Sequence, residues 1–98
     1  MSRHDDIVRP IQRRALLELL ADIGGPHNDE ELKLLLRRFG HRPSGRDVRA
    51  DLQFLAGEEL VRVEALGDFL VAEITSDGRD AAAGDLQVDG VDKHRAMR

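Results

Sequence analysis

The sequence has no cysteine, no tryptophan and no tyrosine, and these absences exclude several classes of site. Without cysteine there is no disulfide framework, no thiolate metal site and no cysteine nucleophile. Three phenylalanines are the only aromatic residues, so the 14 leucines must build most of the core. Because a leucine core in 98 residues leaves little room for a large internal pocket, we expect no bound cofactor.

Long hydrophobic runs are also missing. The longest unbroken apolar run spans four residues, 69–72, whereas a membrane-spanning helix needs about 20. The first six residues are polar and acidic and lack the apolar segment of a secretory signal. We therefore expect a cytoplasmic protein without a membrane partner, and the lack of cysteine fits a reducing compartment.

Charge is unevenly distributed along the chain, whose net charge is −4. Residues 37–53 carry five arginines and two aspartates, whereas residues 54–92 carry two arginines and ten acidic residues. A nucleic-acid-binding surface would therefore be local. Arginine makes up 13 of the 15 basic residues, and its planar fork of donors suits guanine edges and phosphates. A GC-rich genome would also enrich arginine, so position is more informative than composition.

Hydrophobic periodicity predicts three helices, over residues 7–23, 29–39 and 45–56. Asn28 is a good N-cap for the second helix, and Ser44 caps the third with Asp47 as its capping-box partner. The apolar positions recur at three- and four-residue spacing in each helix: Leu16, Leu19, Leu20 and Ile23; Leu32, Leu35, Leu36 and Phe39; Val48, Leu52 and Leu55.

The pattern changes after residue 57. Residues 60–66 and 69–74 are typical of two strands, joined by the two-residue turn Gly67-Asp68. Residues 75–83 predict a short helix that ends at Gly84, and residues 84–98 are predicted to be an extended or disordered tail. The fold class is therefore mainly α with a small β-hairpin, in the order α-α-α-β-β-α.

This order resembles a winged helix-turn-helix domain, which would cover residues 7–83. The segment Ile74-Thr75-Ser76-Asp77-Gly78-Arg79 is similar to the end of the wing in MarR-like and ArsR-like repressors. That turn and the tail segment Val88-Asp89-Gly90-Val91 also resemble the small winged-helix proteins of Mu-like prophages. These resemblances imply a phage or prophage setting and a role as a transcriptional regulator or accessory factor.

The resemblance implies that the third helix enters the major groove of double-stranded DNA. The implied DNA-binding residues are Arg46, Arg49 and Gln53 at base edges, and Arg37, Arg38, Arg42 and Ser44 at phosphates. A solvated helix face is the alternative explanation, in which Arg49 would pair with Asp51 or Glu58. The hairpin favours a second hypothesis, a protein–protein interaction module of phage assembly or packaging, because it carries Glu64, Asp68 and Glu73 and only one base, Arg62.

Metal and catalytic sites are not indicated. His4, His27, His41 and His94 include no pair at the i, i+4 spacing of a helical zinc site. The adjacent acids Asp5-Asp6 and Glu58-Glu59 point apart and do not form an acid/base dyad. We therefore expect no metal and no enzymatic activity.

Two groups of residues suggest further contacts. Ile7, Val8 and Ile11 extend the apolar surface of the first helix beyond its core stripe and suggest a homodimer. The tail carries apolar Leu86, Val88 and Val91 and basic Lys93, Arg95 and Arg98. The apolar set would lie on a partner subunit or on the domain's own surface, and the basic set could touch DNA. A frayed terminus is the other interpretation.

Overall fold

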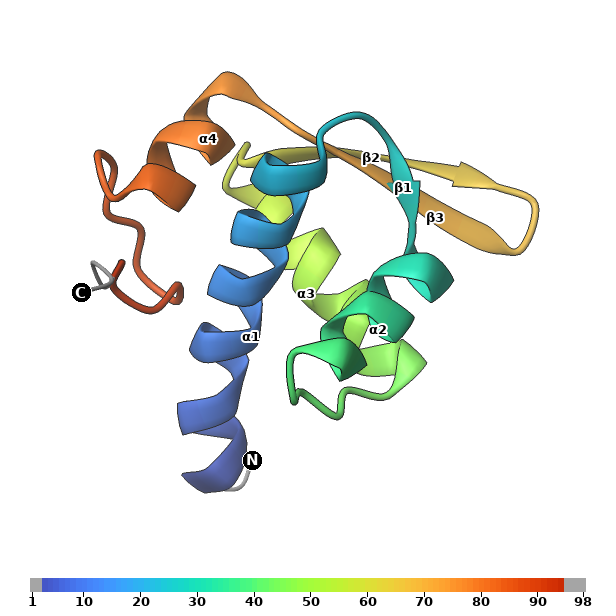
Figure 1. The fold of residues 1–98 in the computed structure, drawn as a ribbon, viewed down its shortest axis with the longest axis horizontal. Helices are drawn as coiled ribbons and strands as arrows, with labels where there is room; N and C mark the ends of the chain where they lie inside the picture. Colours follow the sequence, from blue (N-terminus) through green and yellow to red (C-terminus); the bar gives the residue numbers. More distant parts are fainter. Residues whose placement is uncertain (1–2, 95–98) are drawn as a thin grey trace.

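The computed structural model of the protein describes residues 3–94, with side chains from residue 4 onward. These residues form helices and a small antiparallel sheet in the following order: α1 (Arg3–Ile23), β1 (His27–Asn28), α2 (Asp29–Arg38), α3 (Gly45–Gly57), β2 (Val61–Leu66), β3 (Phe69–Ile74) and α4 (Ser76–Ala83). The predicted class, mainly helical with a small sheet, is confirmed. In Figure 1, α1 stands between α4 and the α2–α3 pair, and the sheet extends away from the helices.

The sheet has three strands in the order β1-β3-β2, and this layout is compatible with a winged helix. The β2–β3 hairpin has the predicted two-residue turn, with Leu66 opposite Phe69, and Gly67 adopts a φ of 58°. Strand β1 was not predicted. It is only two residues long. It forms because His27 pairs with Ala72 of β3, which lies 45 positions further along the sequence, so no local sequence pattern predicts it.

Leucines form the core, as the composition requires. The largest fully buried apolar side chains are Leu16, Leu17, Leu20, Leu32, Leu36, Leu52, Leu55, Leu60 and Val48. The prediction that Ile23 and Phe39 belong to the apolar core stripes is wrong, because Ile23 is 40% exposed and Phe39 is 70% exposed. Ile23 is the last residue of α1, and Phe39 is the C-cap of α2, so both lie where the chain turns away from the core.

Capping residues set the ends of α2 and α3 as predicted. The Asn28 side chain accepts a hydrogen bond from the Glu31 amide, and Ser44 and Asp47 form a reciprocal capping box. Helix α1 differs from the expectation, because it begins at Arg3 rather than Ile7. Its first turn contains Asp5 and Asp6, whose negative charge favours the N-terminal end of the helix dipole.

The Ile74–Arg79 segment forms the corner between β3 and α4. The Thr75 hydroxyl donates to the Glu59 carbonyl at 2.8 Å and accepts the Gly78 amide at 3.0 Å. A Cβ on Gly78 would lie 2.0 Å from the Leu60 carbonyl oxygen, so glycine is required for α4 to approach the sheet. The packing of this corner therefore explains why the segment has threonine at position 75 and glycine at position 78.

The tail residues up to 94 form no helix or strand, yet they pack across the domain's own surface. Val91 is 5% exposed and joins the core, with Val88 partly buried beside it. The Asp92 amide donates to the Pro10 carbonyl at 3.1 Å, and Arg14 donates to the Asp92 carbonyl at 2.6 Å. Of the apolar tail residues, Val88 and Val91 contact the domain itself, whereas Leu86 is 37% exposed. The basic residues Arg95 and Arg98 lie outside the described part.

Candidate nucleic-acid interface

Helix α3 presents a polar face opposite its buried stripe. Arg46, Arg49 and Gln53 are exposed, while Val48 and Leu52 are fully buried. Residues three and four apart share a face of a helix, so these three side chains lie along one line about two turns long. The structure therefore brings together the residues that the sequence assigned to base edges.

The turn between α2 and α3 adds positive charge next to this face. Arg37 and Arg38 end α2, Arg42 lies in the turn, and all three are exposed. The Arg42 guanidinium donates to two main-chain carbonyls, those of Arg37 at 3.3 Å and His41 at 3.1 Å. Ser44 is exposed as well, but its hydroxyl accepts the Asp47 amide at 3.0 Å and so completes the helix cap.

The arginines at this turn lack acidic partners among the described residues. Within the part of the chain whose side chains are described, the guanidinium groups of Arg37, Arg38, Arg42 and Arg46 have no carboxylate partner. Most arginines elsewhere pair with an acid: for example, Arg14 with Glu18. Four unpaired arginines within ten residues therefore form a local positive patch, which we call the arginine turn.

Arg49 differs from its neighbours because it is held in place. Its Nη1 donates to an Asp29 carboxylate oxygen at 2.8 Å and lies 3.4 Å from the Asp68 carbonyl oxygen. The other Asp29 oxygen accepts the Leu70 amide at 2.9 Å. Sequence reasoning offered Asp51 or Glu58 as partners of Arg49, and the structure instead has Asp29. This contact joins α3, the start of α2 and the tip of the hairpin, so it fixes the hairpin beside α3.

The pKa of Asp29 reflects this environment. Burial opposes ionisation of its carboxyl group, but the hydrogen bonds from the Leu70 amide and Arg49 outweigh that cost. The pKa of Asp29 is therefore lowered. The carboxylate that fixes the hairpin stays ionised at neutral pH.

A second carboxylate lies on the inner side of α3. Asp51 is 1% exposed and accepts hydrogen bonds from Arg9 at 2.8 Å and Arg13 at 3.1 Å. Burial raises the pKa of Asp51, while the two arginines act in the opposite direction. Sequence reasoning missed this cluster, because the partners lie about 40 positions away. The cluster fixes the orientation of α3 on α1 and thereby which face α3 presents to solvent.

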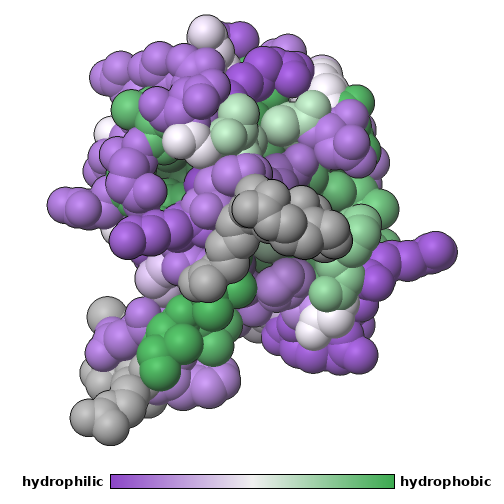
Figure 2. All heavy atoms as spheres, turned by 60° about the vertical axis from the view of Figure 1, so that its left-hand side comes forward, coloured by the Kyte–Doolittle hydropathy of each residue, from purple (hydrophilic) through white to green (hydrophobic). Residues whose placement is uncertain are grey.

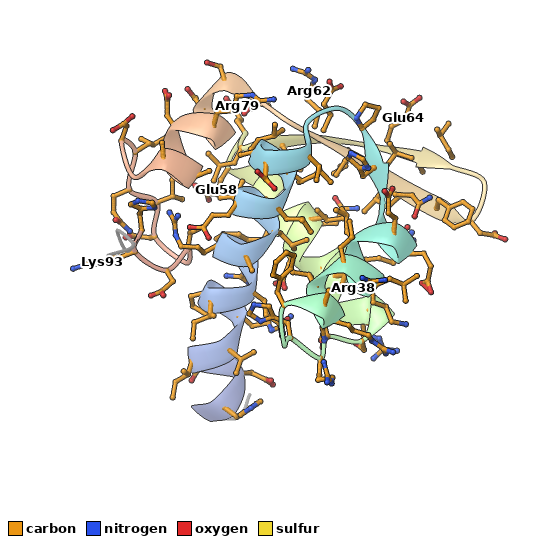
Figure 3. The ribbon with its side chains drawn as sticks, viewed as in Figure 1. Arg38, Glu58, Arg62, Glu64, Arg79 and Lys93 are labelled. Carbon is orange, nitrogen blue, oxygen red and sulfur yellow. The ribbon has the colours of Figure 1, made fainter. Side chains whose placement is uncertain are left out.

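The hairpin, by contrast, carries acidic groups. Glu64 and Asp68 are exposed, and the only hairpin arginine, Arg62, lies 3.9 Å from the Glu73 carboxylate. Figure 3 shows Arg62 and Glu64 along the hairpin, away from Arg38 on α2. The positive and the negative surfaces of the molecule are thus carried by different elements.

Two other kinds of site, a metal site and a membrane-spanning helix, are absent from residues 3–94. No cluster of three or more histidine or acidic residues suited to a metal ion is present in this part of the chain. None of its helices has the length and apolar character needed to cross a membrane.

The fold and charges define a small, mainly helical domain with a layout compatible with a winged helix and a positive patch at the α2–α3 turn. No protein-family model matches the chain. The uncharacterized protein gp26 of Escherichia phage Mu is 36% identical over 91 residues, which cover 93% of this chain and 95% of the phage protein. The chain therefore belongs to the family of this Mu protein and is a phage-related small protein.

Proposed function

We propose that this protein binds double-stranded DNA through α3 and the arginine turn, as a phage regulator or accessory factor. The observation that carries the proposal is the arginine turn, in which four exposed arginines have no carboxylate partner within the part of the chain that the structure describes. Unpaired arginines bind phosphates and release counterions without first breaking an internal ion pair.

The structure supports different roles for the residues of this surface. Arg37, Arg38 and Arg42 lie where they would contact the phosphate backbone, and Arg46 and Gln53 face solvent on α3, where they would reach base edges. Arg49 is already held by Asp29, so its role is to position the hairpin. The acidic hairpin points to DNA contact without the wing, since Glu64 and Asp68 would repel phosphates.

Fluorescence anisotropy of a labelled random-sequence duplex tests this proposal with matched arginine variants. Arg38→Ala should weaken binding to all sequences alike and lower the log–log salt slope by about 1. Arg46→Ala should weaken discrimination at one base pair by about 1–3 kcal/mol, measured on duplexes selected for binding.

Arg79→Ala is the control. This exposed arginine also lacks a carboxylate partner among the described residues, but it lies on α4, at a distance from Arg38 (Figure 3). We expect its binding to equal that of the parent. Equal binding by all three variants would contradict the proposal.

A protein-interaction role is the second candidate, favoured by the hairpin. Besides its acidic groups, the hairpin exposes Leu66 (52%) and Phe69 (46%) at its tip, where they form a cross-strand pair. An acidic strand with an apolar tip suits a basic partner segment with an apolar anchor. This function predicts that duplex DNA does not bind even at low salt. It also predicts that an arginine-rich peptide shifts the NMR amide signals of residues 62–69 rather than those of residues 37–46.

A further inference from the structure

Helix α1 has an outward face that lies largely outside the core, although Ala15 on it is partly buried against the core. His4, Ile7, Ile11, Ala15 and Glu18 follow each other at spacings of three and four and share this face. Ile7 is 58% exposed and Ile11 is 41% exposed. The N-terminal half of α1 projects beyond the rest of the domain (Figure 1), and Figure 2 shows hydrophobic side chains gathered on this projecting part.

The C-terminal half of the same face is hollowed. Ala15 and Leu19 line a hollow with Leu36 and Phe39 at the end of α2, and Phe39 is 70% exposed. A second hollow on this face is lined by Ile11, Ala15 and the tail residue Lys93, among others. The N-terminal half of the α1 face therefore presents the large side chains of Ile7 and Ile11. The C-terminal half presents the small side chain of Ala15, which lines both hollows.

We propose that two copies of this chain associate through α1, antiparallel, with Ile11 on the twofold axis. In this arrangement, the numbers of any two residues that face each other across the axis add up to 22. Ile11 lies against Ile11 of the second copy, Ile7 against its Ala15, and His4 against its Glu18. The projecting isoleucines of each copy fill the hollow of the other, which is the self-complementarity that a twofold interface requires.

Charge favours the antiparallel arrangement over a parallel one. Glu18 and Asp22 are exposed on the C-terminal half of the face. In the antiparallel pair Glu18 lies against the His4 ring of the other α1, which can donate a hydrogen bond to it, while Asp5 and Asp6 of that first turn already meet the helix dipole. A parallel pair would place Glu18 against Glu18. The helix pair makes a small interface, so a concentration-dependent equilibrium between monomer and dimer is expected.

The lack of cysteine allows a direct test, because one introduced thiol is the only one in the chain. We expect Ile11→Cys to form a disulfide-linked dimer under mild oxidation, since residues on the axis bring their Cα atoms within the range of less than about 7 Å that a disulfide needs. Leu34→Cys is the control, because Leu34 is 54% exposed but lies on α2, outside this face. Proximity in the dimer should make Ile11→Cys cross-link at least about tenfold faster than the control.

Sedimentation of the unmodified protein and of Ile7→Glu completes the test. All three variant positions, 7, 11 and 34, are exposed, so the far-UV circular dichroism of the variants should equal that of the parent. A parent that dimerises and an Ile7→Glu variant that stays monomeric support the proposal. A parent that remains monomeric at high micromolar concentration, or equal cross-linking at residues 11 and 34, overturns it. No DNA is present in these measurements, so their outcome is independent of the proposed function.

Discussion

Replacing Asp29 with alanine removes two interactions whose magnitudes differ, and the difference can be predicted from burial. The Asp29 carboxylate, on a residue 8% exposed, accepts the Leu70 amide at 2.9 Å and the Arg49 guanidinium at 2.8 Å. A buried amide left without an acceptor costs about 1–3 kcal/mol. The Arg49 side chain is 44% exposed, so its ion pair contributes about 0–1 kcal/mol.

We therefore expect Asp29→Ala to lower the free energy of unfolding by about 1–4 kcal/mol, which is the sum of the two losses and is dominated by the amide. Arg49→Ala should lower it by about 0.5 kcal/mol, because it removes only the half-exposed ion pair and the long contact with the Asp68 carbonyl. In a domain of this size, 1 kcal/mol corresponds to a shift in Tm of about 4–8 °C. The loss caused by Asp29→Ala is therefore easily measured by urea or thermal unfolding followed by circular dichroism.

The pH dependence gives a second check on Asp29. Since its pKa is lowered in the folded state, its stabilising effect is present above the ordinary carboxyl pKa of about 3.9 and is lost as the pH falls through the lowered value. The stability difference between the parent and Asp29→Asn should therefore shrink below about pH 4. If Arg49→Ala destabilises as much as Asp29→Ala, the reasoning is refuted, because the ion pair would then dominate over the amide hydrogen bond.

Three further predictions concern a helix cap, a histidine and a close-packed glycine. Ser44→Ala should cost about 1 kcal/mol in urea unfolding, since it removes half of the capping box of α3; an unchanged midpoint would contradict this. The pKa of His27 is raised: burial opposes its protonation, but the hydrogen bonds to Glu31 and the Gly24 carbonyl outweigh it. Its stabilising effect is full below the ordinary pKa of about 6.5 and is lost as the pH rises through the raised value, so His27→Gln should lower Tm more under mildly acidic than alkaline conditions. Gly78→Ala should destabilise by about 1–3 kcal/mol or more, because its Cβ would overlap the Leu60 carbonyl; a parent-like Tm would show that α4 can shift without cost.

The local features of the fold could be predicted from the sequence. The Asn28 and Ser44 caps and the Gly67-Asp68 turn depend on residues within four positions of one another, and the structure has all three. Features that depend on distant residues could not be predicted. Strand β1 and the Asp51 cluster with Arg9 and Arg13 are of this kind, because their partners lie roughly 40 positions away.

In the candidate site, too, the features set by nearby residues could be predicted and those set by distant residues could not. A helical wheel placed Arg46, Arg49 and Gln53 on the outer face of α3, and all three are exposed. The wheel could not show which of them is bound by another element. Only the folded chain brings Asp29 to Arg49, and this contact changes the proposed role of Arg49 from reading a base to positioning the hairpin.

The most direct test of DNA binding by the arginine turn is the salt dependence of binding to duplex DNA. Three guanidinium groups on phosphates, those of Arg37, Arg38 and Arg42, predict that the logarithm of the binding constant falls with the logarithm of the salt concentration with a slope of about −3. Removing Arg37 and Arg38 together should reduce this slope to about −1. Absence of binding at low salt, or a slope that the double replacement leaves unchanged, would contradict the account.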